Sequence, residues 1–78
     1  MVKEGRTMAE AIKAGNWFQI SRNGYSYDPP ACESPEEVMA CARKKFGDIS
    51  KGEVFQVHRI IGGGIGSRVM EYVGEMVY

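Results

Sequence analysis

The chain has 78 residues, which is enough for one domain covering residues 1–78. A core of this size supplies only roughly 3 to 5 kcal/mol of net stability, so a large internal active-site cavity is disfavoured. Ten basic and ten acidic residues cancel, and the isoelectric point is about 6.6. This balance disfavours a general nucleic-acid binder, whose isoelectric point typically exceeds about 9. It also disfavours electrostatic attachment to a membrane.

Targeting signals are not evident in the sequence. The first fifteen residues, MVKEGRTMAEAIKAG, are interrupted by charges and contain no apolar signal region. The longest apolar stretch is far shorter than the roughly 20 residues of a membrane-spanning helix. We therefore expect a soluble cytoplasmic protein that does not enter the membrane, with residues 1–6 forming a mobile arm.

The first predicted element is a short helix. Thr7 and Glu10 have the spacing of a capping box, in which each side chain accepts a hydrogen bond from the backbone of the other residue. The helix is predicted to run through Ala14, and Gly15 is placed to end it. Because only about two turns fit, this helix must pack on another element to be stable.

Residues 16–28 are predicted to form a β-hairpin. Asn23-Gly24 favours a two-residue type I′ turn, which pairs Arg22 with Tyr25. Alternation along the strands then gives one core face and leaves Trp17 on the other. The predicted core face consists of Phe18, Ile20, Tyr25 and Tyr27.

Residues 34–47 contain the signals of a complete helix. Ser34 is the predicted N-cap, Pro35 fits the first helical position, and Glu37 is spaced to close a second capping box. Basic residues occupy the last turn, where the helix dipole favours cations, and Gly47 is placed to end the helix. The apolar stripe predicted to pack on the sheet consists of Val38, Met39, Ala42 and Phe46.

The C-terminal third is predicted to add two further strands. Alternation predicts a strand over residues 53–61, with Ile61 on the same face as Phe55 and Val57. We expect residues 62–66, GGGIG, to form a loop, because glycines weaken regular elements. Residues 67–78 fit a strand or a helix, and their Val, Tyr and Gly content favours the strand. The predicted fold is α+β, a two-layer sandwich of one antiparallel sheet on one main helix, in the order α-β-β-α-β-β.

The residues that could take part in catalysis or metal binding do not form a recognisable motif. The glycine run lacks the third glycine of a dinucleotide-binding fingerprint and the lysine of a phosphate-binding loop. Cys32, Cys41 and His58 lack the spacing of a zinc site, and a nucleophile–histidine pair among them is only a third hypothesis. We therefore predict a protein that is not an enzyme and that needs neither a metal nor a cofactor.

The leading functional hypothesis is a protein-binding domain. Aromatic and arginine residues are enriched among interface hot spots. Trp17 is the strongest indication of a binding surface, although the N-terminal helix could equally cover it. The C-terminal segment offers a second binding surface or a homodimer contact. The predicted contact residues are Trp17, Arg22, Tyr25, His58 and Arg59.

An alternative hypothesis is a small nucleic-acid-binding module. Basic residues such as Arg43, Lys44 and Arg68 would contact phosphates, and aromatic residues of the sheet would stack on bases. This hypothesis predicts an affinity that falls steeply with salt. The charge balance of the chain places it second.

The layout resembles small accessory proteins of bacteriophages and mobile elements of the anti-CRISPR type. The likeness covers about half of the chain, SPEEVMACARKKFG followed by EVFQVHRI and a closing segment, that is, a capped helix followed by a hairpin. It is a likeness of size and layout and transfers no site residues. It implies a stoichiometric inhibitor that occupies a surface of a host protein or complex, such as a CRISPR–Cas defence complex.

Overall fold

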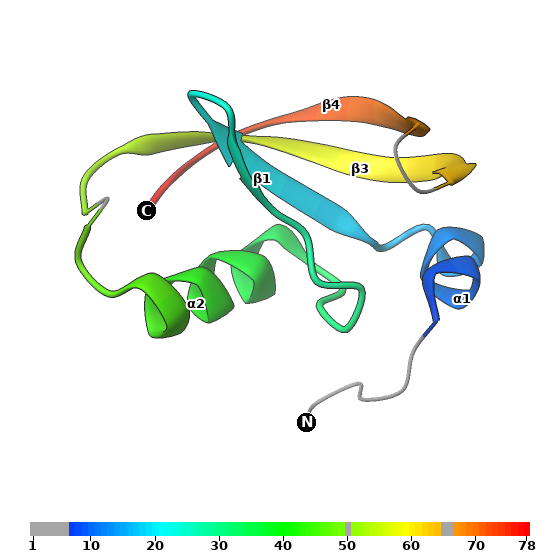
Figure 1. Cartoon of the computed structure of the whole chain (residues 1–78), viewed down its shortest axis with the longest axis horizontal. Helices are drawn as coiled ribbons and strands as arrows, with labels where there is room; N and C mark the ends of the chain where they lie inside the picture. Colours follow the sequence, from blue (N-terminus) through cyan, green and yellow to red (C-terminus); the bar gives the residue numbers. More distant parts are fainter. Residues whose placement is uncertain (1–6, 50, 65–66) are drawn as a thin grey trace.

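The computed structural model describes residues 7–49, 51–64 and 67–78. Four antiparallel strands form one sheet in the order β2-β1-β3-β4, and helix α2 covers one face of it (Figure 1). The predicted α+β fold and its element order are confirmed, and residues 67–77 form a strand. The elements are α1 (Met8–Ala14), β1 (Phe18–Arg22), β2 (Tyr25–Tyr27), α2 (Pro35–Phe46), β3 (Val54–Gly64) and β4 (Ser67–Val77). The predicted arm, residues 1–6, lies outside the described residues.

Both helices begin at caps that the sequence encodes. At α1 the Thr7 side chain accepts from the Glu10 N–H at 3.1 Å, and the Glu10 carboxylate accepts from the Thr7 N–H at 2.9 Å. At α2 the Ser34 hydroxyl accepts from the Glu37 N–H at 3.2 Å. The predicted second capping box is wrong in one detail, because the Glu37 carboxylate accepts from the Glu33 N–H instead of from Ser34.

Replacing Ser34 with alanine tests the contribution of this cap. The Glu37 N–H would lose its acceptor, and N-cap removal costs about 1 kcal/mol of stability. We expect S34A to lower the urea midpoint of unfolding with an unchanged slope. Thr7→Ala, which removes the N-cap of α1, is the variant with which S34A is compared. If S34A leaves the midpoint unchanged, the cap does not stabilise the folded state.

The β1–β2 hairpin has the predicted turn and register. Asn23 and Gly24 have φ values of 50° and 80°, as a type I′ turn requires, and Arg22 lies opposite Tyr25. Asn23 is the only non-glycine with positive φ among the described residues. This turn fixes the register that directs Phe18 and Ile20 towards α2.

The main core lies between α2 and the sheet. It combines side chains from β1, β3, α2 and the segment before α2, and Ile20, Val38 and Met39 have no exposed surface. Burying each such side chain stabilises the fold by about 1.5 to 3 kcal/mol before the entropy cost. The buried members are Phe18, Ile20, Cys32, Val38, Met39, Ala42, Phe55 and Val57.

A second, smaller core lies where α1 meets the sheet. Trp17 is only 1 % exposed and packs with Ala11 of α1 and Ile60 of β3. Its indole Nε1 donates to the Asp28 carbonyl at 2.7 Å, and the Arg68 guanidinium lies 4.8 Å from the ring centroid. Arg68 also forms an ion pair with Asp28. The short α1 is therefore held in place because it packs on the indole of Trp17.

Strand β3 is longer than the sequence predicts. The prediction that Gly62-Gly63-Gly64 form part of a loop is wrong, because all three pair with β4, Gly63 opposite Arg68. The remaining residues of that predicted loop, 65–66, lie outside the described residues. Ile61 was also predicted to face the core, but it is 48 % exposed, because the pairing register shifts between Ile60 and Gly62.

The end of β4 is tied to the end of α2. The Tyr78 hydroxyl lies 2.6 Å from the Gly47 carbonyl and 3.1 Å from the Ala42 carbonyl, so its single proton is shared between two acceptors. The Tyr78 N–H donates to the Glu53 carbonyl at 2.8 Å, and its ring packs against Phe55. These contacts join the edge strand to the helix C-terminus.

Candidate protein-interaction surface

Most of the exposed large apolar side chains gather on one hairpin. Seven of the nine such side chains among the described residues belong to β3 or β4, whereas Tyr25 and Ile49 lie elsewhere. Large exposed apolar areas commonly mark interaction sites. We call these seven the hairpin surface: Val54, Ile61, Val69, Met70, Tyr72, Val73 and Val77.

Strand β4 is one edge of the sheet and is unusually open for an edge strand. It is 11 residues long, whereas the opposite edge, β2, has only three. An edge strand exposes backbone N–H and C=O groups that can pair with another chain, and proteins commonly protect such edges with lysine, proline or bulges. Strand β4 contains no lysine or proline. A register shift opposite Val57 and His58 leaves Val73 as an extra residue of β4, and its charged residues are Arg68, Glu71 and Glu75.

Three cross-strand pairs of β3 and β4 lie on the sheet face opposite α2. Val54 lies opposite Val77, Gln56 opposite Glu75, and His58 opposite Tyr72. They alternate with the buried Phe55 and Val57, which face α2. The His58 and Tyr72 rings make an edge contact at 5.4 Å between centroids. This face combines exposed apolar and polar side chains, a composition typical of interfaces.

A groove of about 400 Å³ runs between the first turn of α2 and β4. Gly74 lies opposite Val57, and without a side chain there the space beside β4 stays open. The apolar part of the lining includes Val57, Val73 and Met76, and the carboxylate-bearing residues Glu36 and Glu75 also line it. The groove therefore suits an apolar side chain that is accompanied by a basic one.

The predicted contact residues are not brought together. Trp17 lies in the second core, so of the two alternatives the helix covers it, and its prediction as a contact residue is wrong for this structure. The physical reason is that α1 needs an apolar partner and the indole supplies it. Tyr25 is 42 % exposed but lies on β2, where its ring packs edge-on against Phe46 at 5.2 Å.

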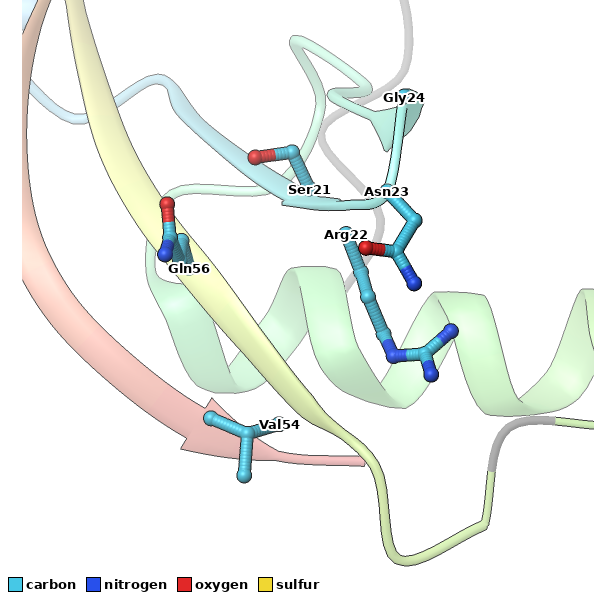
Figure 2. A pocket seen from close by; sticks show the side chains of 6 residues that line it. All are labelled: Ser21, Arg22, Asn23, Gly24, Val54 and Gln56. Atoms are coloured by element: carbon cyan, nitrogen blue, oxygen red, sulfur yellow. The ribbon is translucent and has the colours of Figure 1, made fainter.

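The two predicted arginines are engaged in ion pairs. Arg22 pairs with Glu53 at 2.8 Å, and Arg59 pairs with Glu71 at 3.1 Å while lying over the Phe18 ring. A shallow depression of about 460 Å³ lies beside Arg22 at the hairpin turn, where Figure 2 shows Ser21 and Gln56 on one side and Arg22 on the other. Arg68 is also paired, with Asp28. The ion pairs of Arg22, Arg59 and Arg68 leave less unpaired positive charge for phosphates, which disfavours the nucleic-acid hypothesis.

His58 is the predicted contact residue that lies on the open sheet face. It is half-buried beside Tyr72 and lies opposite Gln19 of β1. Its Nδ1 is shielded from solvent and has no hydrogen-bond partner within the described residues. The sequence predicts the C-terminal segment as a second surface but does not place it beside His58, because residues 67–78 fit a strand or a helix.

The thiols and the imidazole do not converge. Cys32 belongs to the core on the α2 side, whereas His58 follows Val57 on β3 and points to the opposite face. Burial, followed by the contact with Cys41, raises the pKa of the Cys32 thiol to about 12, which makes it a poor nucleophile at neutral pH. No group of three or more metal-ligating side chains occurs in residues 7–49, 51–64 and 67–78.

Comparisons with known proteins return no relatives. No family model, curated protein or solved structure matches this chain. Neither helix in the described part of the chain has the length and apolar character needed to cross a membrane.

Proposed function

We propose that this chain is a non-enzymatic protein-binding domain that docks an extended segment of its partner along β4. The observation that carries this proposal concerns the exposed large apolar side chains of the described residues: seven of the nine lie on β3 and β4, beside an open 11-residue edge. In strand addition, backbone hydrogen bonds provide affinity and pockets for alternate side chains provide specificity.

The groove beside β4 defines the chemistry of the docked segment. An added strand would run past Gly74, where every second side chain points towards α2. One apolar side chain of the segment fits over Val57, and a lysine or arginine whose side chain also points towards α2 lies near Glu36. The partner segment is therefore extended, apolar at one position and basic nearby.

This mode of binding suits an inhibitor that acts by occupying a surface. The resemblance in size and layout to anti-CRISPR proteins supports a host defence complex in the cytoplasm as the target. Such an inhibitor acts stoichiometrically, because the site offers contact area and no reaction chemistry. The partner's identity then depends on which host protein exposes a segment of the stated chemistry.

A lysine at the open edge tests the proposal. Val73→Lys places a charge on the exposed edge and beside the groove, and charged residues at edges block strand addition. We expect affinity capture from host cells, quantified by mass spectrometry, to lose the specific partner by at least tenfold, that is about 1.4 kcal/mol. The far-ultraviolet circular dichroism of V73K should match that of the unmodified chain.

Ile49→Lys is the matched control. Ile49 is the most exposed large apolar residue in the described part of the chain, at 80 %, and lies in the turn between α2 and β3. We expect I49K to retain the partner. Equal capture by V73K and the unmodified chain would exclude docking along β4. If only I49K loses the partner, the interface lies at the turn between α2 and β3 and not along β4.

A further inference from the structure

The two cysteines lie in direct contact in the fold. The Cys32 and Cys41 sulfur atoms are 3.4 Å apart, and both thiols are free. A disulfide has a sulfur–sulfur distance of about 2.05 Å, so a small movement of each side chain suffices to form one. Cys32 lies in the segment between β2 and α2, and Cys41 lies on α2, so these two residues connect two separate pieces of backbone.

The two thiols differ in their access to solvent. Cys32 is 5 % exposed and belongs to the main core, whereas Cys41 is half-buried at the edge of that core. An external reagent therefore reaches Cys41 first, and Cys32 is placed directly behind it. An accessible cysteine backed by a second, resolving cysteine is the arrangement found in redox-sensitive thiol pairs.

We propose that Cys32 and Cys41 form a dithiol site that accepts oxidising equivalents from small disulfides such as oxidised glutathione, and closes to a reversible intramolecular disulfide. The proposal stands on the sulfur–sulfur contact and on the unequal exposure of the two thiols. It is independent of the docking surface on β4.

The reaction proceeds in two balanced exchanges. In the first, the Cys41 sulfur attacks one sulfur of oxidised glutathione, a mixed disulfide forms, and one reduced glutathione leaves with the Cys41 proton. In the second, the Cys32 sulfur attacks the Cys41 sulfur of that mixed disulfide, and the second glutathione leaves with the Cys32 proton. The protein loses two electrons and two protons, and one oxidised glutathione becomes two reduced ones.

The second exchange requires the buried Cys32 thiol to lose its proton. Burial, followed by the contact with Cys41, raises the pKa of the Cys32 thiol to about 12, so little of it is thiolate at neutral pH. Since the thiolate is the attacking form, closure should be faster at pH 9 than at pH 7. The disulfide then links α2 covalently to the segment between β2 and α2. This segment lies next to Asp28, whose carbonyl accepts from Trp17, and it includes Glu33, which accepts from Asn16.

Incubating the folded chain with oxidised glutathione tests the site. Samples are quenched with acid and analysed by intact mass spectrometry. We expect a product that lacks two hydrogen atoms, has no glutathione attached, and returns to the starting mass with dithiothreitol. A product that stops at one attached glutathione, or a folded chain that does not react while the urea-unfolded chain does, would overturn the proposal.

Single serine variants separate the two roles. C32S should stop at a stable adduct of one glutathione on Cys41. C41S should react at least about tenfold more slowly than C32S, because only the buried thiol remains. Equal reaction rates for C32S and C41S would show that the order of attack is wrong. Circular dichroism confirms folding, and the conservative C41A variant replaces C41S if the hydroxyl disturbs the core.

Discussion

Trp17→Ala is expected to leave the chain largely unfolded at 25 °C. The substitution removes the largest fully buried side chain, and large-to-small core changes of Trp cost about 3 to 5 kcal/mol. It also leaves the Asp28 carbonyl without its indole donor and uncovers α1. This loss equals the roughly 3 to 5 kcal/mol that a domain of this size has in total. Far-ultraviolet circular dichroism during urea titration measures it.

Trp17→Phe is the control for this prediction. Phenylalanine keeps most of the apolar contact with Ala11 and Ile60 but cannot donate to Asp28. We expect W17F to remain folded and to lose about 1 to 2 kcal/mol. Trp17 is the only tryptophan, so its fluorescence cannot follow the unfolding of either variant. An alanine variant within 1 kcal/mol of the unmodified chain would mean that the second core contributes little.

Gly63→Ala is expected to disrupt the β3–β4 hairpin. Gly63 has φ +87°, and a Cβ at this position would lie 2.2 Å from the Ser67 carbonyl oxygen and 2.8 Å from the Arg68 Cα. Both neighbours are backbone atoms, so the strands must separate locally to accommodate the methyl group. Strain of this kind costs about 1 to 3 kcal/mol. Urea unfolding measures the loss, and amide hydrogen exchange shows whether it is centred on residues 60–63 and 67–70.

Gly74→Ala is the matched control on the same hairpin. A Cβ at Gly74 meets no atom within 4 Å, and its φ is not positive. We expect G74A to be neutral or slightly stabilising, because alanine loses less backbone freedom on folding than glycine. If G63A and G74A unfold at the same urea concentration, the close approach at Gly63 relaxes without cost.

The helices and the first hairpin were predictable because their signals are local. Ser34, Pro35 and Gly47 define α2 within its own segment, and Asn23-Gly24 alone fixes the register of β1 and β2. The assignment of β4 depended instead on pairing with β3. Its strand preference in sequence was moderate. Phe18 and Arg59, which pair where β1 joins β3, are forty-one positions apart in the sequence, so long-range pairing decided the sheet order.

The surface was less predictable, because burial depends on contacts between distant segments. Strand alternation predicts that Trp17 lies on the outer face of the hairpin. It is buried because α1 packs against it, which the alternation does not show. Gly62 to Gly64 looked like a loop because the composition does not show that β4 offers pairing partners. The cysteine contact likewise depends on how the segment after β2 returns to α2.

The shared proton of Tyr78 has a consequence for how the molecule opens. The hydroxyl of Tyr78, the residue that follows the edge strand, contacts the carbonyl of Ala42 in α2 and that of Gly47 just after α2. When the edge strand detaches, the helix loses these contacts at the same moment, and two elements that lie in different layers open as one cooperative unit. We therefore expect fraying of the helix terminus and of the sheet margin, which ordinarily start independently, to be coupled in this chain.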